Sequence, residues 1–296
     1  MLKHILLFPF LFLFISSTYP IALFHGILLD CSSTQMKNLQ MNLQKYLKTK
    51  VHCIEIGNGS QDSVLMNLEK QSIEACNKIK SHPDFQNKFN IFGVSQGTLI
   101  GRYIIQKCND MKGKVQNYVS FMGPQMGIGY IPKLTCGKYC DFLNKIVSAF
   151  EDNDPQYLID NLAPASYWKY RYHYDRFLKN NVYLKDLNNE GEVKNEEYKK
   201  RILNLNQILL IKGKQDTVIA PKESSWFEFY DKKGQKIVPL KNSEFYIKDF
   251  IGIRKLNEEG RLKFALFYGE HCVYNLKEFI KHIVTFLKDD GSNKEK

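Results

Sequence analysis

The 296-residue sequence lacks features that mark several classes of protein. After the N-terminal segment, no apolar run is long enough to cross a bilayer, so we expect a soluble mature protein without a stable membrane span. The chain has no internal repeats, which argues against repeat architectures. No basic block interleaved with aromatic residues suggests a nucleic-acid groove. We attribute the net charge of +11 to a composition rich in Lys and Asn.

The spacing of a common zinc site is also missing. Among seven cysteines only Cys136 and Cys140 form a close pair, and a zinc site of the usual kind needs two such pairs. We therefore expect no metal. Cys136 and Cys140 enclose a tight loop that a disulfide can close easily.

The first 19 residues have the pattern of a secretory signal peptide. A short basic start precedes an apolar stretch over residues 5–15 and a few small polar residues. Removal of this peptide would leave one domain at 20–290 and a polar tail at 291–296. Asn58 begins a glycosylation sequon, Asn-Gly-Ser, which suits a protein of the secretory pathway.

Ser95 is the best candidate for a catalytic nucleophile. It stands at the centre of Gly-Val-Ser-Gln-Gly, residues 93–97, between a strand-like run and a helix-like run. A strand, a tight turn with serine at its apex and a helix form the nucleophile elbow of α/β-hydrolases. The alternative is an ordinary glycine-rich turn.

Strand-like and helix-like patterns alternate along most of the chain. Strand patterns cover residues 20–24, 51–56, 89–92, 115–121, 207–211 and 262–268, and helix patterns cover 36–47, 64–79 and 98–105. This alternation predicts the α/β class and an α/β-hydrolase fold with a doubly wound, mostly parallel sheet. It stops at about 124–200, where we expect a helical lid insertion. The apolar run 142–150 either lines a groove for an acyl chain or packs the core of the insertion.

The serine needs a histidine as base and an acid that orients the histidine. In this fold the acid follows the serine in the chain, and the histidine follows the acid. Only three histidines come after Ser95. His271 directly follows the last strand pattern, in the loop where this fold places its base. His282 falls within a helix pattern, and His173 falls in an aromatic stretch of the insertion.

Asp216 is the candidate acid. It lies just beyond the apolar run 207–211, at the end of a predicted buried strand. Catalytic groups gather at the carboxyl edge of parallel sheets. Asp231 and Asp249 follow no comparable strand, and a turn aspartate is the alternative role for Asp216.

Two backbone N–H groups are expected to form an oxyanion hole. One belongs to Gln96, directly after the nucleophile. The other belongs to Ile27, in the loop after the first strand, where Gly26 permits close approach. His25 precedes the serine in the chain, and we expect a structural role for its ring.

Other cysteines also suggest pairing. Cys76 and Cys108 lie on helices that should flank the same central strand, so a disulfide between them is plausible. Cys31 and Cys53 form a possible second pair, and Cys272 could stay reduced.

Further motifs resemble the palmitoyl-protein thioesterases, lysosomal enzymes that remove fatty acyl groups from cysteines of lipidated proteins. The elbow is similar to the family's G-x-S-Q-G, which precedes a helix with an arginine and a terminal cysteine, here Arg102 and Cys108. Other similar segments are 140–142, 167–168, 183–188, 197–200, 226–230 and 269–271. The loop 27–31 departs from the family pattern, which has a further glycine and aspartate after His-Gly.

The resemblance implies a role for each candidate. It assigns the triad to Ser95, Asp216 and His271, the oxyanion donors to Ile27 and Gln96, and two disulfides to Cys76–Cys108 and Cys136–Cys140.

The expected activity is hydrolysis of fatty acyl thioesters on S-acylated proteins, without metal or cofactor, in a lysosome or outside the cell. A lipase or acyl-CoA thioesterase would use the same triad. A non-catalytic lipid-binding protein is an alternative of another class. The oligomeric state and the acyl length stay open.

Overall fold

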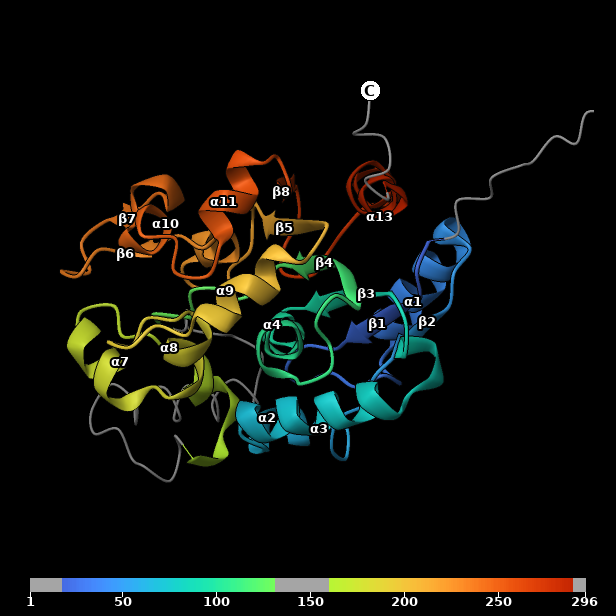
Figure 1. Cartoon of the computed structure of the whole chain (residues 1–296), viewed down its shortest axis with the longest axis horizontal. Coiled ribbons are helices and arrows are strands. Elements are labelled where there is room, and N and C mark those ends of the chain that lie inside the picture. The colour runs from blue at the N-terminus through green and yellow to red at the C-terminus, as the bar shows by residue number, and fades with distance from the viewer. Residues whose placement is uncertain (1–17, 131–159, 290–296) are drawn as a thin grey trace, which may run out of the picture.

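The computed structural model describes residues 18–130 and 160–289. Within them, six parallel strands form one sheet in the order β2-β1-β3-β4-β5-β8 (Figure 1). The strands are β1 (Ile21–Phe24), β2 (Val51–Cys53), β3 (Phe89–Val94), β4 (Val115–Phe121), β5 (Gln207–Gly213) and β8 (Leu262–Phe267). A separate antiparallel pair consists of β6 (Phe229–Tyr230) and β7 (Ile237–Val238). The predicted α/β-hydrolase fold is confirmed.

Helices lie on both sides of this sheet. The α-helices of the described residues are α1 (Thr34–Leu47), α2 (Asp62–Leu65), α3 (Leu68–Ser81), α4 (Gly97–Lys107), α7 (Tyr174–Asn180), α8 (Tyr183–Leu187), α9 (Glu196–Leu203), α10 (Glu244–Ile247), α11 (Ile253–Glu258), α12 (Leu276–Glu278) and α13 (Thr285–Lys288). A π-helical segment, Phe279–Val284, connects α12 to α13. Among the described helices, none combines the length and apolar character that a membrane crossing requires.

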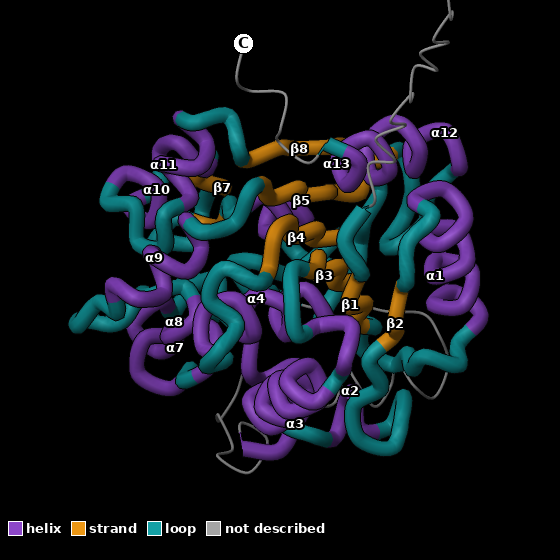
Figure 2. The backbone as a smooth tube through the Cα atoms, turned by 45° about the vertical axis from the view of Figure 1, so that its right-hand side comes forward, coloured by secondary structure: helices purple, strands orange, loops and turns teal. Residues whose placement is uncertain are grey.

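Both faces of the sheet are buried. Along β5, Ile208 and Leu210 pack into one apolar core, while Leu209 and Ile211 pack into the other. The first core lies under α3 and α4, and the second lies under α1 and the C-terminal helical segment (Figures 1 and 2). Burial on both faces explains why this strand is continuously apolar.

Helix α1 owes its position to an apolar stripe. Its buried residues are Met36, Leu39, Leu43 and Leu47, at intervals of three and four. This spacing places all four on one side of a helix, against the sheet. The helix ends where Lys48 adopts a left-handed conformation with φ of 55°.

Residues 160–203 pack beside α4 and are held there by a buried arginine. The guanidinium of Arg102 donates to the carbonyl of Leu187 at 2.8 Å, to Oδ1 of Asn188 at 2.9 Å and to the carbonyl of Gln125 at 3.2 Å. Burial lowers the pKa of Arg102 to about 10, and the side chain remains charged at neutral pH. These hydrogen bonds from a charged guanidinium fix residues 160–203 to α4, the helix that follows Ser95.

Several predictions lie outside the described residues. They are the signal peptide, the polar tail, the Cys136–Cys140 pair and the apolar run 142–150. The proposed domain and insertion boundaries therefore stay predictions.

Two elements differ from the sequence-based expectation. The strand expected over 51–56 ends at Cys53, and the helix expected over 64–79 is divided into α2 and α3. Asn67 begins α3, because its side chain accepts the backbone N–H of Glu69 at 2.8 Å. Asparagine at this position favours a new helix start over continuation of the earlier one.

Candidate active site

Ser95 occupies a strained turn between β3 and α4. Its φ of 50° lies in the left-handed region, which residues with a side chain rarely adopt. A Cβ on Gly93 would lie 2.6 Å from the backbone nitrogen of Thr98, and one on Gly97 would lie 2.5 Å from the carbonyl oxygen of Phe24. The two glycines therefore let strand and helix approach each other, as an elbow requires.

His271 lies between Ser95 and Asp216. Its Nε2 is 2.9 Å from Oγ of Ser95, and its Nδ1 is 2.8 Å from Oδ2 of Asp216. The Asp216 side chain is fully buried, whereas 16% of the His271 side chain is exposed. The structure thus brings together the three residues that the sequence singled out, in the order hydroxyl, imidazole, carboxylate.

The backbone also fixes Asp216. Its Oδ1 accepts the N–H groups of Val218 at 2.9 Å and Ile219 at 3.0 Å, which leaves Oδ2 facing His271. A carboxylate at Nδ1 favours the tautomer with the proton on that nitrogen. Nε2 is then able to accept the proton of the Ser95 hydroxyl.

Opposing effects act on the pKa of His271. Burial by itself lowers this pKa, because it disfavours the charged imidazolium. The adjacent sulfur of Cys272 and the hydrogen-bonded carboxylate of Asp216 outweigh burial and raise the pKa above its ordinary value. His271 is therefore a stronger base than an isolated histidine, and it is protonated in acid.

The rival candidates have other surroundings. His173 precedes α7, and His282 lies in the π-helical segment against an aromatic ring. Asp231 accepts a backbone N–H within a turn, and Asp249 pairs with a lysine at 3.1 Å. Their described contacts do not include Ser95 or His271.

The loop after β1 approaches the nucleophile closely. A Cβ on Gly26 would lie 3.0 Å from Cβ of Ser95. Within the described residues, the backbone N–H groups of Ile27 and Gln96 donate to no protein acceptor. Two such donors beside a nucleophile are what an oxyanion hole needs.

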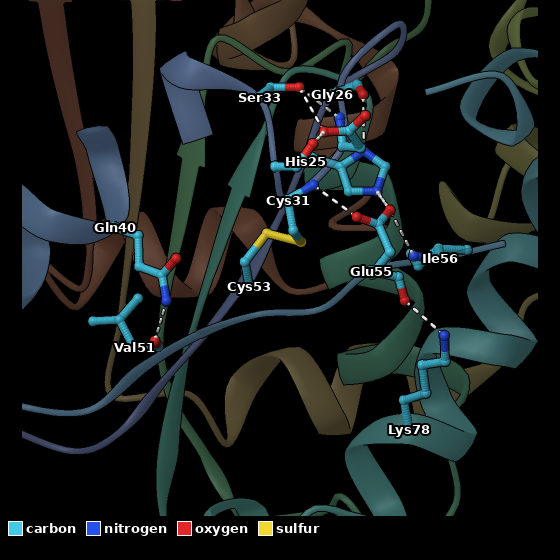
Figure 3. Close-up of a disulfide and its surroundings, with 12 residues drawn as sticks. His25, Gly26, Cys31, Ser33, Gln40, Val51, Cys53, Glu55, Ile56 and Lys78 are labelled. Atoms are coloured by element: carbon cyan, nitrogen blue, oxygen red, sulfur yellow. Dashed lines mark hydrogen bonds and ion pairs between the residues drawn. A yellow bond between two sulfur atoms is a disulfide. The ribbon is translucent and has the colours of Figure 1, made fainter. Parts of the chain in front are cut away.

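Residues at the end of β2 and in α2 anchor the loop that follows β1. A disulfide joins Cys31 to Cys53 at the end of β2 (Figure 3). Glu55 accepts the backbone N–H of Cys31 at 2.8 Å, and Ser63 accepts that of Leu28 at 2.8 Å. The loop beside Ser95 is thus tied to its surroundings covalently and through two hydrogen bonds.

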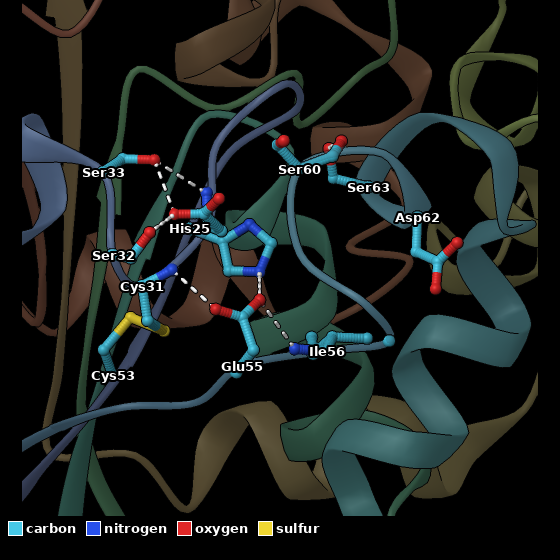
Figure 4. A network of polar contacts seen from close by, with 12 residues as sticks. His25, Cys31, Ser32, Ser33, Cys53, Glu55, Ile56, Ser60, Asp62 and Ser63 are labelled. Atoms are coloured by element: carbon cyan, nitrogen blue, oxygen red, sulfur yellow. Dashed lines mark hydrogen bonds and ion pairs between the residues drawn. A yellow bond between two sulfur atoms is a disulfide. The ribbon is translucent and has the colours of Figure 1, made fainter.

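Glu55 also faces the buried ring of His25. Its Oε1 lies 3.2 Å from Nε2 of His25 (Figure 4), and Nδ1 of the same ring lies 3.0 Å from the carbonyl of Gly26 (Figure 3). The ring therefore lies between the loop and Glu55. No sequence pattern marks Glu55 or Ser63, because their role depends on contacts between segments that are distant in the chain.

Strained backbone gathers around the site. In the described residues nine non-glycine residues have positive φ, and four of them follow sheet strands at the carboxyl edge: Leu28, Ser95, Met122 and Cys272. Strain of this kind persists only where surrounding contacts enforce it, and it is common at functional sites.

A second disulfide joins Cys76 to Cys108, connecting α3 with the end of α4. Cys272 is a free, partly exposed thiol. Asn58 is exposed, and its side chain donates to Asp62 at 3.0 Å, while its glycosylation stays a prediction.

One group of side chains has the composition of a metal site. In the described part of the chain, His52, His82 and Asp84 bring potential ligand atoms within 4.8 Å of one another. Asp84 already pairs with His52 and with Lys50, both at 2.8 Å. These contacts account for the arrangement, and the group shares no described contact with the Ser95 site.

Sequence comparisons with known proteins agree on one family. A family model described as palmitoyl protein thioesterase matches residues 20–271. Palmitoyl-protein thioesterase 3 of Dictyostelium discoideum is 33% identical over 283 residues, covering 95% of this chain and 94% of that protein. Lysosomal thioesterase PPT2-B of Xenopus laevis is 28% identical, covering 88% and 89% of the two chains.

Among solved structures, the monoacylglycerol lipase of Paleococcus ferrophilus has a TM-score of 0.48 and 15% identity, covering 92% of this chain and 94% of that one. The matched residues 20–271 include Ser95, Asp216 and His271. The chain belongs to the palmitoyl protein thioesterase family.

Proposed function

We propose that this protein hydrolyses fatty acyl thioesters on S-acylated proteins, with Ser95 as nucleophile, His271 as base and Asp216 as the orienting acid. The observation that carries the proposal is the chain of two hydrogen bonds, 2.9 Å and 2.8 Å long, that links these side chains. Membership in a thioesterase family supplies the class of substrate.

In the first half of the reaction, the Oγ of Ser95 attacks the thioester carbonyl carbon while His271 takes the hydroxyl proton. The carbonyl oxygen becomes an oxyanion, which the N–H groups of Ile27 and Gln96 would stabilise. The carbon–sulfur bond then breaks. The imidazolium returns its proton to the departing thiolate, which leaves as the free thiol and yields an acyl-enzyme.

Water completes the cycle. His271 takes a proton from a water molecule, whose oxygen attacks the acyl carbonyl on Ser95. The bond between carbonyl carbon and Oγ breaks, and His271 returns the proton to Ser95. The products are a fatty acid and the regenerated enzyme, and Asp216 keeps the imidazole in the same tautomer throughout.

The experiment compares wild-type protein with Ser95→Ala on a palmitoylated cysteine peptide. We expect the variant to lose hydrolysis, and we expect an alkyl fluorophosphonate to label the wild type at Ser95. Full activity of Ser95→Ala would overturn the assignment. The same kcat/KM for the peptide, palmitoyl-CoA and a palmitoyl oxygen ester would contradict the proposal that S-acylated proteins are the substrate class.

We also propose that residues 1–19 direct the chain into the secretory pathway, and that the protein acts in a lysosome or outside the cell. The disulfides Cys31–Cys53 and Cys76–Cys108 suit an oxidising compartment. N-terminal sequencing of protein purified from cells tests this proposal. A chain that still begins at Met1 would contradict it.

A further inference from the structure

Ser63, on the short helix α2, links the two parts of the chain to which we assign the oxyanion hole. Its Oγ accepts the backbone N–H of Leu28 at 2.8 Å, one residue after Ile27. Its carbonyl oxygen accepts the side-chain Nε2 of Gln96 at 2.8 Å. One residue therefore contacts both the loop that carries the first donor and the residue that carries the second.

Ser63 is itself held in place. Its hydroxyl donates to the carbonyl of Ser60 at 2.6 Å, and the two serines lie close together in Figure 4. Only 1% of Ser63 is exposed, so water does not compete for its hydrogen bonds. A buried bond whose partners are both fixed transmits position well, because neither group can turn away to solvent.

The contact with Leu28 matters for the direction of the Ile27 N–H. Leu28 has a φ of 60°, a strained conformation that persists only where neighbours enforce it. On the other side of Ile27, the carbonyl of Gly26 lies 3.0 Å from Nδ1 of His25. This carbonyl belongs to the same peptide group as the Ile27 N–H. The peptide groups before and after Ile27 are therefore both held.

The side chain of Gln96 is bonded at both ends. Its Nε2 donates to Ser63, and its Oε1 accepts the hydroxyl of Tyr167 at 3.1 Å. All three residues are buried. Because the Gln96 side chain cannot turn, the backbone N–H of the same residue keeps its direction beside Ser95.

We propose that Ser63 is a positioning residue that sets the separation and direction of the two oxyanion donors. This inference rests on the proposed function, because the oxyanion forms only when Ser95 attacks a carbonyl. Within the described residues, no hydrogen bond of Ser63 reaches Ser95 or His271. Its effect on the reaction therefore passes through the donors and not through the base.

Ser63→Ala tests the inference by removing the acceptor of the Leu28 N–H. Ser243→Ala is the matched control. The Oγ of Ser243 likewise donates to a carbonyl three residues earlier, at 2.7 Å, and accepts a backbone N–H, that of Tyr246 at 3.2 Å. Ser243 precedes α10 and does not line the cavity at Ser95.

We expect Ser63→Ala to lower kcat about 10- to 100-fold on a palmitoylated cysteine peptide, somewhat less than the loss of a whole donor. KM should change less than about twofold, since oxyanion donors act on the transition state and not on the bound substrate. Ser243→Ala should keep the kcat and KM of the wild type. An unchanged kcat in Ser63→Ala would overturn the inference.

A transition-state mimic separates positioning from a general loss of structure. An alkyl trifluoromethyl ketone forms a tetrahedral adduct with Ser95, and this adduct carries an oxyanion. In Ser63→Ala its inhibition constant should rise by the same factor by which kcat/KM falls. The pH midpoint of kcat/KM should stay at the wild-type value, because the contacts of His271 are intact. A lower kcat with an unchanged inhibition constant would overturn the inference.

Tyr167→Phe provides a second, milder variant that decides the question even if Ser63→Ala does not fold. It removes only the hydroxyl that holds Oε1 of Gln96. We expect kcat to fall and the inhibition constant of the ketone to rise, both about 3- to 10-fold. Wild-type values for both would contradict the role of the Gln96 side chain. They would leave the assignment of Ser95 intact, which the Ser95→Ala variant tests separately.

Discussion

Gly26 and Ser95 lie so close together that a methyl group on Gly26 would be 3.0 Å from Cβ of the serine. Gly26→Ala should therefore push the loop and the Ile27 amide away from the nucleophile. Loss of one oxyanion donor costs about 10²–10³ in turnover, and we expect kcat to fall by up to that amount. Steady-state kinetics on an acyl thioester measure the effect.

Gly191→Ala is the control for that variant, since the nearest atom to its added methyl would be 3.8 Å away. It should retain the kcat of the wild type. An unchanged kcat in Gly26→Ala would mean that the loop does not contribute to the oxyanion hole as proposed.

Asp216→Asn tests the orienting acid. The amide cannot favour the same tautomer of His271, and comparable changes in other triads lower kcat by about 10⁴. We expect a loss of that order with little change in KM. Asp231→Asn, in a turn with no described contact to the site, should leave kcat intact, and a mild effect of Asp216→Asn would refute its assigned role.

The raised pKa of His271 predicts a particular pH dependence. Only the neutral imidazole can take the Ser95 proton, so kcat/KM should rise with pH through the pKa of the free enzyme. The midpoint should lie above the ordinary histidine value of about 6.5. Cys272→Ala should lower the midpoint, because Cys272 is one cause of the raised pKa. A wild-type midpoint below 6.5 would contradict this account.

The Cys31–Cys53 disulfide should contribute to both stability and turnover. It closes a loop between positions 22 residues apart, and loss of such a constraint costs about 3 kcal/mol. The double variant Cys31→Ser/Cys53→Ser should unfold at lower denaturant concentration and have a lower kcat, since the loop beside Ser95 loses its covalent anchor. Wild-type values for both quantities would show that the hydrogen bonds of Glu55 and Ser63 suffice.

Arg102→Met should destabilise the fold strongly. The substitution leaves buried acceptors on Asn188 and Gln125 without their donor, and it leaves the Leu187 carbonyl with the Gln106 amide alone, at an expected cost of about 3 kcal/mol or more. Denaturant unfolding measures the change, with the exposed Lys255→Ala as control. A loss below about 1 kcal/mol would mean that the neighbouring residues compensate for the missing guanidinium.

The catalytic candidates could be predicted from the sequence, because their order along the chain and their positions after strands are visible in it. Ser95, Asp216 and His271 each follow a strand that the apolar pattern reveals, so parallel pairing alone brings them to one edge of the sheet. The two glycines around Ser95 indicate the close approach of strand and helix, and they are visible in the pentapeptide itself.

The rest depended on contacts between segments far apart in the chain. Glu55 matters because the end of β2 lies beside the loop at Cys31, and no periodicity encodes that meeting. Cysteine spacing likewise left the partner of Cys31 open. The apolar cavity of about 850 Å³ beside Ser95 and His271 is lined by segments far apart in the chain, which no local pattern brings together.

The Cys76–Cys108 disulfide closes a ring of chain that carries the nucleophile near its middle. Residues 86–88 form an exposed stretch of that ring. A protease that cuts the ring once at this stretch cannot release either fragment, because the sulfur–sulfur bond still holds both. The part of the molecule that carries Ser95 is thus protected against dissociation after a single cleavage, which is an advantage in any compartment rich in digestive enzymes.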